Sequence, residues 1–386
     1  MKRTTANPPI IGIVGAGQLA RMTIQAAIPL AIPIRLLADR ADDGAAKVSS
    51  DVTIGSPNDF AALDAFSSQC DVMTFDHELV PFEHLLKLEA AGRTLYPSAA
   101  TMALAQNKRL QREQFAAAGL PVPPFRIIEQ SSQLVSFGRL LGWPVVLKAA
   151  RGGYDGRGVW IASDEGSGVG LCEELLNLGV EVLAEQWVPI EREVAILVAR
   201  RPGGEIAVYP LVETIQVDGM CRELVAPAVV SDEIASEAYR IAEVVAGIAG
   251  VVGILAVELF VTEGKVLINE IATRPHNSGH YSIEGCVTSQ FEQHLRAVLD
   301  WPLGSTDLTA PFVVTVNIVG GDDGTDPTSR LAEALAVEGV HVHFYGKGAR
   351  PGRKLGHVTV TGKDLADVQR RADLAEAILS GRAGEV

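Results

Sequence analysis

The chain has 386 residues, enough for two or three domains, and its 47% hydrophobic and 21% charged residues are typical of a folded globular protein. Its formal net charge of -14 disfavours a general nucleic-acid binder, which needs a positive surface. No apolar run reaches the roughly 18 residues of a membrane span, and the polar stretch 1–9 does not predict a signal peptide. We therefore expect a cytoplasmic protein without membrane or nucleic-acid partners.

The first hundred residues alternate strand-like and helix-like segments, which predicts a parallel sheet. Strands are expected at 10–14, 33–38 and 72–75, and helices at 18–28, at 58–68 and after Pro81. Gly15, Gly17 and Asp39 fit the dinucleotide-binding fingerprint, in which glycines let a phosphate approach a helix N-terminus. Any tight strand-to-helix turn also favours glycine, so a ligand-binding turn, an NAD site and a plain turn stay open.

A second pattern begins after a proline-rich connection at 121–124. Helices are expected at 107–118 and 232–249, and strands at 144–149, 182–188, 194–200, 206–212, 255–261 and 265–271. Short turns join most of these strands, which indicates an antiparallel sheet in an α+β domain. A smaller unit is expected from 302, with strands at 312–319 and 340–344 and a helix at 365–379. We predict three domains, at 1–105, 106–301 and 302–386.

A glycine-rich loop follows Lys148, which ends a predicted strand. Four glycines lie within residues 152–158, so several backbone N–H groups are available to wrap phosphate oxygens. Lys148 adds a positive charge for the same phosphates, and the loop lacks the GKS or GKT ending of a P-loop. We predict a mobile loop that covers phosphates. The strand edge at 185–188 offers main-chain groups for an adenine, with Glu193 near a ribose, although plain sheet also explains that segment.

Two glutamates are predicted to meet on neighbouring strands. If the turn centres on Gly264, Glu258 and Glu270 face each other across a hairpin. Two opposed carboxylates repel each other, so we expect a cation between them. Oxygen ligands favour magnesium that bridges the phosphates of ATP. A slip of one residue in the register would instead point the two side chains to opposite faces.

Two later segments are rich in polar and basic residues. The stretch 274–280 is too polar for a strand and contains His276, for which we expect contact with a substrate or a phosphate rather than a transition metal. A glycine-containing segment around 345–354 concentrates basic residues in an otherwise acidic chain: Lys347, Arg350, Arg353, Lys354 and His357. Arginine offers paired donors to phosphate oxygens, so this cluster predicts a substrate monophosphate. A solvated loop is the alternative.

Taken together, these stretches resemble the ATP-grasp family, and within it the enzymes that carboxylate aminoimidazole ribonucleotide. The motifs that carry the resemblance are GAGQLARM, GGYDGRG, EQWVPIEREVAILVAR, AVELFVTE, NEIATRPHNSGHYSIEGCVTSQFEQHLRAVL and GRKLGHVTV. The resemblance implies an α/β and α+β chain: an ATP-grasp fold with an N-terminal Rossmann-like parallel-sheet domain and a small C-terminal domain that binds the substrate phosphate. It also implies a homodimeric carboxylating ligase of purine biosynthesis that uses ATP, Mg2+ and bicarbonate through carboxyphosphate.

The resemblance also assigns roles to individual residues. ATP contacts are expected from Lys108, Lys148, Gly153, Tyr154, Asp155, Gly156, Arg157, Gly158, Glu185, Gln186, Trp187, Val188, Glu193, Gln216, Asn269 and Glu270. Ribonucleotide contacts are expected from Gln18, Leu19, Glu78, Tyr154, Asp155, Arg157, His276, Lys347, Arg353 and Lys354. Glu258 and Glu270 would hold magnesium. Asp155, Arg157 and His276 are the catalytic candidates.

The chain departs from the family's pattern at a few positions. The segment 75–79 keeps one glutamate, Glu78, but loses the family's asparagine, while Gln216 stands for a histidine and Lys108 for an arginine. None of these changes removes a charge that the chemistry needs. Three other functions stay open: a formate-dependent glycinamide ribonucleotide transformylase of the same fold, an NAD-dependent dehydrogenase, and a non-catalytic ATP-binding regulator. The dehydrogenase leaves the carboxylate pair unused, and the intact pair argues against the regulator.

Overall fold

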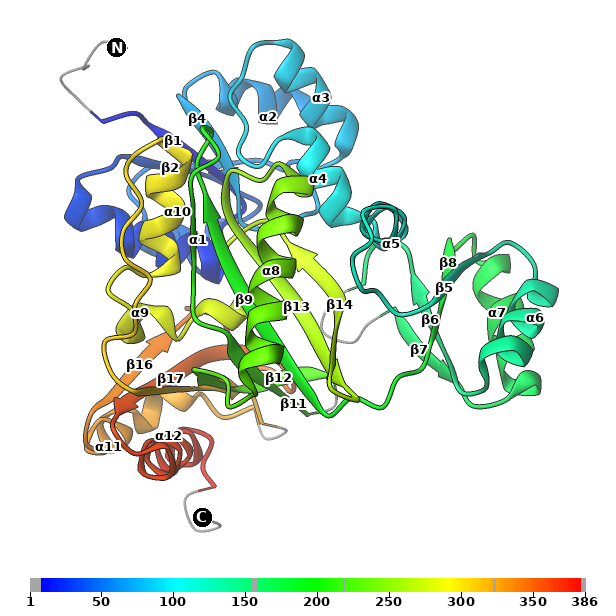
Figure 1. Cartoon of the computed structure of the whole chain (residues 1–386). Helices are drawn as coiled ribbons and strands as arrows, with labels where there is room; N and C mark the ends of the chain where they lie inside the picture. The colour runs from blue at the N-terminus through cyan, green and yellow to red at the C-terminus, as the bar shows by residue number, and fades with distance from the viewer. Residues whose placement is uncertain (1–7, 154–157, 218, 322–323, 383–386) are drawn as a thin grey trace.

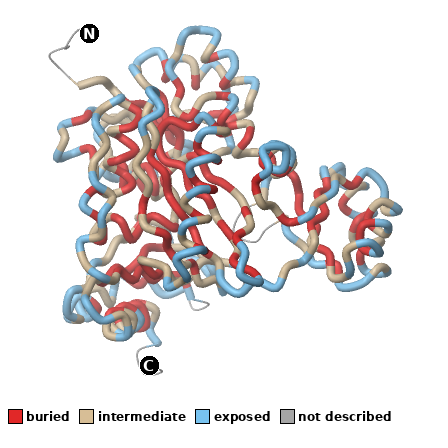
Figure 2. The backbone as a smooth tube through the Cα atoms, viewed as in Figure 1, coloured by how far each residue is buried: buried red, intermediate tan, exposed pale blue. Residues whose placement is uncertain are grey.

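The computed structural model describes residues 8–153, 158–217, 219–321 and 324–382. In these ranges the strands form three sheets, which lie in the N-terminal part, in a lobe at one side, and through the centre into the C-terminal part (Figure 1). Buried residues concentrate along the strands, and exposed residues lie mostly on the outer helices and turns (Figure 2). None of the helices in the described ranges combines the length and the hydrophobicity of a membrane-spanning segment.

The N-terminal sheet is parallel, as the alternating pattern predicted, with the strand order β3-β2-β1-β4. Its strands are β1 (Ile11–Val14), β2 (Ile34–Ala38), β3 (Val52–Ile54) and β4 (Val72–Phe75). Its helices are α1 (Gln18–Ala27), α2 (Phe60–Ser67) and α3 (Phe82–Ala90). Every residue of β1 is buried, because helices cover both faces of a parallel sheet. Helices α4 (Ala99–Gln106) and α5 (Lys108–Ala117) lead out of this part.

The side lobe is a small antiparallel sheet with two helices against it. Its strands are β5 (Phe125–Ile128), β6 (Val145–Ala149), β7 (Val159–Ala162) and β8 (Val182–Gln186), in the order β5-β8-β6-β7. Helices α6 (Ser131–Leu141) and α7 (Glu165–Asn177) share its apolar core. The glycine-rich loop joins β6 to β7. The lobe therefore contributes Lys148, on β6, and the described Gly152 and Gly153 to the cleft between the parts of the chain.

The central sheet is antiparallel in every described pairing and runs β14-β13-β9-β11-β12-β15-β17-β16, with β10 paired to β9. Its strands are β9 (Arg192–Arg200), β10 (Ile206–Val208), β11 (Val212–Val217), β12 (Met220–Ala226), β13 (Gly253–Thr262), β14 (Lys265–Ala272), β15 (Phe312–Val319), β16 (Val340–Phe344) and β17 (Lys354–Gly362). Alternate residues of β9 enter two different cores, because successive side chains of a strand point to opposite faces.

Helices cover both faces of this central sheet. The long helix α8 (Asp232–Ala249) packs on one face, where its apolar stripe meets β9 and β13. On the other side, α10 (Gln290–Val298) lies between the central sheet and the N-terminal part, and its Leu295 and Val298 join the N-terminal core. The short helix α9 (Ser282–Gly285) precedes it. The 3-10 helices are η1 (Ile28–Leu30), η2 (Ala46–Val48), η3 (Asn277–Gly279) and η4 (Pro327–Arg330).

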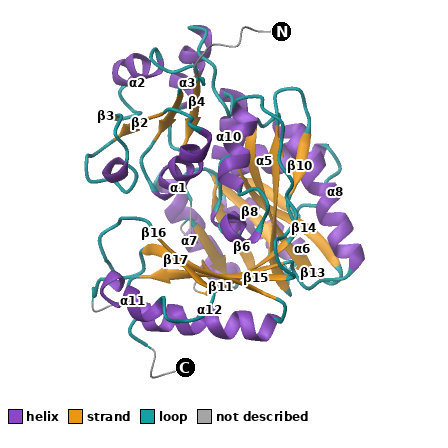
Figure 3. Cartoon of the chain, turned by 90° about the vertical axis from the view of Figure 1, so that its left-hand side faces the viewer, coloured by secondary structure: helices purple, strands orange, loops and turns teal. Residues whose placement is uncertain are grey.

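The C-terminal strands continue the central sheet. Strand β15 pairs with β12, where Val314 lies opposite Val225, so the unit that we predicted from 302 shares one sheet with the preceding residues. Helices α11 (Leu331–Ala334) and α12 (Leu365–Leu379) pack beneath these strands, as the second view shows (Figure 3). Strand β17 was not predicted, because its glycine, histidine and threonine residues do not form an apolar run. The loop between β16 and β17 carries the predicted basic cluster.

Candidate active site

A cleft of about 1560 Å³ opens where the N-terminal part, the side lobe and the central sheet come together. The predicted and described site residues that line it are Gln18, Leu19, Glu78, Lys108, Lys148, Gly153, Glu185, Gln186, Trp187, Val188, Glu193, Gln216, Glu258, Asn269, Glu270, His276, Lys347, Arg353 and Lys354. Gly158 is described but does not line the cleft. Tyr154, Asp155, Gly156 and Arg157 lie outside the described residues. Segments far apart in the sequence thus meet at one site.

The two predicted metal ligands lie opposite each other, and a β-bulge produces this pairing. Near the turn, Leu259 pairs with Ile268, a register that would place Glu258 opposite Asn269. The register then shifts by one residue, so that Glu258 pairs with Glu270 instead. A bulge inserts one extra residue and re-aims the side chains beyond it. The predicted pairing is confirmed, but it depends on the bulge at Asn269 rather than on a turn centred on Gly264.

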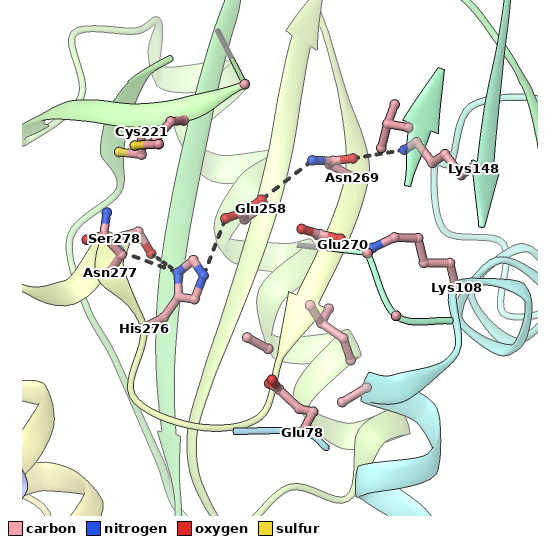
Figure 4. Close-up of a pocket in the computed structure, with 18 of the residues that line it drawn as sticks. Glu78, Lys108, Lys148, Cys221, Glu258, Asn269, Glu270, His276, Asn277 and Ser278 are labelled. Carbon is pink, nitrogen blue, oxygen red and sulfur yellow. Dashed lines mark hydrogen bonds and ion pairs between the residues drawn. The ribbon is translucent and has the colours of Figure 1, made fainter. Parts of the chain in front are cut away.

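The electrostatics of this pair show a need for positive charge. Lys108 forms an ion pair with Glu270 (Figure 4). Burial raises the pKa of Glu270, but the ammonium groups of Lys108 and Lys148 outweigh burial and hold it below its usual value. Burial, followed by the carboxylates of Glu270 and Glu193, raises the pKa of Glu258 to about 8. The pair therefore holds more negative charge than it tolerates without a cation.

These residues fit magnesium as the expected ion. The ammonium group of Lys108 already lies against Glu270, which shows that this position accepts a cation. Within the described ranges, no group of three or more histidine, cysteine, aspartate or glutamate side chains is arranged to hold a metal. A pair of carboxylates that leaves the other positions to phosphate oxygens and water matches the preference of Mg2+ at ATP sites.

A fully buried arginine links the side lobe to the central sheet. Arg112 on α5 donates from Nε to Oε1 of Glu185 at 2.7 Å and from Nη2 to the carbonyl oxygen of Asn269, also at 2.7 Å. Lys148 contacts Oε2 of Glu185 at 2.8 Å and donates to Oδ1 of Asn269 at 3.2 Å. Burial alone would raise the pKa of Glu185, but Arg112 and Lys148 lower it to about 2. Arg112, Lys148, Glu185, Lys108 and Glu270 form what we call the nucleotide corner.

Apolar side chains line the cleft beside this corner. Ile161 is 60% exposed, Trp187 is 43% exposed and Ile190 is 45% exposed, and all three face the cleft. Strand β8 ends at Gln186, so Trp187 and Val188 have left the regular sheet. Exposed apolar groups gathered in a concave site are typical of a ligand pocket. They support the prediction that the segment 185–188 faces an adenine ring.

His276 lies directly beside the carboxylate pair. Its Nε2 atom is 3.6 Å from Oε1 of Glu258, and its Nδ1 atom is 2.9 Å from Oγ of Ser278 (Figure 4). Nδ2 of Asn269 reaches the other oxygen of Glu258 at 3.5 Å. The bulged strand and the segment after β14 thus aim their polar groups at one point. His280, by contrast, is fully buried and belongs to the interior rather than to the cleft.

A second part of the cleft is basic. Lys347 donates to Oε1 of Gln18, and Arg353 donates to the carbonyl oxygen of Gly348 at 3.2 Å. The loop that carries these side chains is held to the N-terminal part by Lys47, which donates to the carbonyl oxygen of Gly346 at 2.8 Å. We call Gln18, Lys347, Arg350, Arg353 and Lys354 the ribonucleotide corner. It concentrates positive charge at a solvent-accessible surface, as a phosphate-binding site requires.

The N-terminal glycine turn does not present an open phosphate site. The carboxylate of Asp76 accepts hydrogen bonds from the backbone N–H of Gly17 at 2.5 Å and of Ala20 at 3.0 Å. It therefore occupies the N-terminus of α1, which the dinucleotide fingerprint reserves for a phosphate. Of the three interpretations left open for this turn, a phosphate at its helix N-terminus is not supported, and the NAD-dependent alternative loses its main support. Gln18 and Leu19, which follow the turn, still line the cleft.

Several cleft residues were named from the sequence only as members of a polar or basic segment. Arg274 forms an ion pair with Glu78 at 2.8 Å and lines the cleft, as does Arg350. His357, expected in the same basic cluster as Arg350, is instead fully buried. Arg112 was not named at all. Arg112 lies behind the cleft, one helical turn after Lys108. A second basic residue four positions after a predicted ligand is a usable signal, because residues four apart share a helix face. For Arg274, its position next to His276 was the available signal.

Comparisons with known families divide the chain into three matching parts. Residues 9–106 match the ribonucleotide synthetase preATP-grasp domain, residues 113–291 match the ATP-grasp domain, and residues 313–371 match the phosphoribosylaminoimidazole carboxylase C-terminal domain. The N5-carboxyaminoimidazole ribonucleotide synthase of Mycobacterium tuberculosis is 47% identical over 379 residues, which cover 96% of this chain and 88% of that protein. That of Synechococcus elongatus is 37% identical over 373 residues, covering 96% and 93%.

Solved structures agree with the sequence matches. An ADP complex of N5-carboxyaminoimidazole ribonucleotide synthetase superposes with a TM-score of 0.90 at 35% identity, covering 99% of this chain and 100% of that one. The Aspergillus clavatus N5-carboxyaminoimidazole synthase, in complex with ADP and 5-aminoimidazole ribonucleotide, has a TM-score of 0.88 at 32% identity, covering 97% and 99%. The predicted ATP-grasp fold is confirmed. The chain belongs to the N5-carboxyaminoimidazole ribonucleotide synthase family of ATP-grasp enzymes.

Proposed function

We propose that this chain is an ATP-dependent ligase of purine biosynthesis that carboxylates 5-aminoimidazole ribonucleotide with bicarbonate. The observation that carries the proposal is that the ribonucleotide corner and the Lys108, Lys148, Glu185 and Glu270 side of the nucleotide corner line one cleft. A relative of similar fold is described as a complex with ADP and 5-aminoimidazole ribonucleotide. The product is the N5-carboxylated ribonucleotide, together with ADP and phosphate.

The nucleotide corner is suited to bind ATP. Lys148 and Lys108 would neutralise phosphate oxygens, and the loop between Gly153 and Gly158 would cover them. Glu258 and Glu270 would hold magnesium. When bound, magnesium would supply a Lewis acid that withdraws charge from the phosphate oxygens. Lys108 and Lys148 are paired with Glu270 and Glu185 of the chain itself. Binding of ATP must therefore replace some of these ion pairs with contacts to the phosphates.

The reaction proceeds in two steps that require exclusion of water. An oxygen of bicarbonate attacks the γ-phosphorus of ATP, the bond to ADP breaks, and carboxyphosphate forms. Carboxyphosphate then releases carbon dioxide and phosphate, the exocyclic amine adds to the carbon, and the proton lost by the amine passes to phosphate. Carboxyphosphate hydrolyses in water, so a closed site protects it. His276, beside Glu258, would orient the amine, while the roles of Asp155 and Arg157 stay predictions.

The experiment that tests this function is ADP release with defined substrates. We expect ADP release in bicarbonate buffer that depends on aminoimidazole ribonucleotide, with formation of its carboxylated product. Formate with glycinamide ribonucleotide serves as the second substrate pair. ADP release with that pair alone would identify the transformylase instead, and nucleotide binding without any turnover would identify a regulator.

The predicted magnesium ligands have a test of their own. Glu270→Gln should lower turnover by about 1,000-fold, because loss of one metal ligand removes several kcal/mol of charge stabilisation. Glu263→Gln, at the exposed tip of the same hairpin, is the control and should retain the activity. Near-normal turnover of Glu270→Gln would refute the assignment. The homodimer, measurable by light scattering, and the cytoplasmic location stay predictions.

A further inference from the structure

The backbone of His276 is held on both sides by one buried amide. The N–H of His276 donates to Oε1 of Gln290 at 2.8 Å, and Nε2 of Gln290 donates to the carbonyl oxygen of His276 at 2.8 Å. Gln290 is the first residue of α10, and its side chain is 0% exposed. A single side chain that satisfies both backbone groups of a residue fixes the position of that residue more tightly than one bond would.

The surroundings leave the amide of Gln290 little freedom to move. A Cβ atom on Gly279 would lie 2.5 Å from Oε1 of Gln290, so a glycine is needed there to admit the amide. The backbone N–H of Gln290 donates to Oγ of Ser282 at 2.9 Å, and its Nε2 lies 3.2 Å from Nδ1 of the buried His280. The amide is thus seated in a rigid and fully buried environment.

With the backbone fixed, the ring of His276 has one preferred arrangement. The backbone N–H of Ser278 donates to Nδ1 of His276 at 3.3 Å. Nδ1 accepts this bond, so a ring proton is placed on Nε2. Nε2 points towards Oε1 of Glu258 at 3.6 Å, where the reacting groups would meet.

We propose that Gln290 is a positioning residue for the carboxylation step. Gln290 does not line the cleft itself. It acts by holding His276 so that the Nε2–H group of His276 faces Glu258 and the reacting amine. The inference rests on the proposed function and names the side chain that keeps its candidate catalytic histidine in place. A displacement of about 1 Å at a reacting group costs about 100-fold in rate, so the clamp has a measurable consequence.

The same helix contains a matched control. Gln293 makes the same two-bond arrangement with Gly304, donating to its carbonyl oxygen and accepting from its N–H, both at 2.8 Å. Gln293 is also 0% exposed. Gly304 does not line the cleft. The two glutamines therefore differ in the segment that they hold, and not in chemistry, burial or helix.

The test compares Gln290→Ala, Gln290→Glu and Gln293→Ala in the full chain. Both alanine variants should lower Tm. Gln290→Ala removes the partner of the His276 N–H, while the carbonyl oxygen of His276 keeps its bond from the N–H of Gly279 at 2.9 Å. Gln293→Ala removes both bonds to Gly304. Gln290→Ala should lose about 100-fold in kcat/KM for aminoimidazole ribonucleotide, with KM for ATP within about twofold of wild type. It should also lose the rise in Tm that the ribonucleotide produces. Gln293→Ala should keep wild-type values for both substrates.

Gln290→Glu makes the test independent of whether the alanine variant folds. Glutamate still accepts from the N–H of His276 but cannot donate to its carbonyl oxygen, so we expect a loss of about tenfold. The proposal is overturned if the folded Gln290 variants keep wild-type kcat/KM, or if Gln293→Ala loses as much as Gln290→Ala. Absence of ribonucleotide-dependent ADP release in the wild type would instead refute the proposed function, before any variant is compared.

Discussion

The two corners of the cleft handle positive charge in different ways. In the nucleotide corner, each cation is paired with a carboxylate of the chain: Lys108 with Glu270, and both Arg112 and Lys148 with Glu185. In the ribonucleotide corner, Arg353 donates to a neutral oxygen atom, the carbonyl oxygen of Gly348, and Arg350 is exposed.

Burial explains the difference. Arg112 and Glu185 have side chains that are 1% and 2% exposed, and an unpaired charge at that depth is costly. Arg350 in the ribonucleotide corner is exposed, so water solvates its charge until an anion binds. The buried corner is therefore built as part of the folded core, whereas the open corner is available to be used for recognition. Mutations in the nucleotide corner should therefore change stability, whereas mutations in the ribonucleotide corner should change substrate recognition.

The largest effect is expected in the nucleotide corner, on stability. Arg112→Met should lower the free energy of unfolding by about 3 to 5 kcal/mol, because it leaves Glu185 with one cationic partner fewer in a buried site. Arg109→Met is the matched control on the same helix. The ion pairs of Arg109 with Glu113 and Glu181 are solvent-exposed, and each is worth about 1 kcal/mol or less. Urea denaturation measures both, and equal losses would contradict the contrast between the corners.

A smaller effect is expected in the ribonucleotide corner, on recognition and not on stability. Arg353→Ala should lower kcat/KM for aminoimidazole ribonucleotide by about 10- to 100-fold, since a hydrogen bond to a charged group contributes about 1.5 to 3 kcal/mol. KM for ATP and the urea midpoint should stay unchanged. Arg370→Ala, on the exposed side of α12, is the control. A loss of stability, or an equal effect on ATP, would show that the two corners are not separable.

The sequence predicted the elements that bring the corners together. Helix α8 and helix α12 have the bounds that the apolar pattern and the terminal residues indicated. The opposition of Glu258 and Glu270 was also predicted correctly, although the register reaches it through the bulge at Asn269. A hairpin pattern specifies which strands pair, but a bulge depends on local packing that a single sequence does not reveal.

The residues that the sequence did not reveal act through contacts distant in the chain. Arg112 reaches the carbonyl oxygen of Asn269, and Gln290 reaches both backbone groups of His276. A motif shows which residue types are present but not which buried amide or guanidinium meets which backbone group. Asp76 is the opposite case, since the glycine turn left a phosphate site open at a helix N-terminus where the chain supplies its own carboxylate. The roles of Arg112, Gln290 and Asp76 all depend on contacts with residues distant in the chain.

Stacked histidines join the strands on either side of the loop that carries most of the ribonucleotide corner. His357 on β17 stacks on His280 at 5.0 Å and on His343 of β16 at 4.7 Å between ring centroids, and its Nδ1 lies 2.9 Å from the hydroxyl of Tyr345. His343 also contacts Glu284. Burial, and then the neighbouring histidines, lower the pKa of His357 well below its usual value. Burial likewise lowers the pKa of His280.

The two corners should therefore respond to acid in different pH windows. The folded-state pKa values of His280 and His357 lie below the unfolded value of about 6.5, so their stabilisation is complete above that pH and is lost as pH falls below it. The pKa of Glu185 is lowered to about 2 from 4.5, so its contribution is lost only as pH falls from 4.5 towards 2. Between pH 7 and pH 5 the contribution of His280 and His357 is therefore lost, whereas that of Glu185 is kept.

This difference gives the smallest of the expected effects, and hydrogen exchange can locate it. From pH 7 to pH 5, corrected amide protection should fall in β16 and β17, by up to about 1.4 kcal/mol per pH unit for each histidine, and should persist in β8. His357→Asn keeps an acceptor near Tyr345 but does not titrate. It should therefore remove the part of the pH-dependent loss of protection in β16 and β17 that His357 contributes. An equal loss of protection in β8 would show that acid acts on the whole fold, and that the two corners do not differ in how they hold charge.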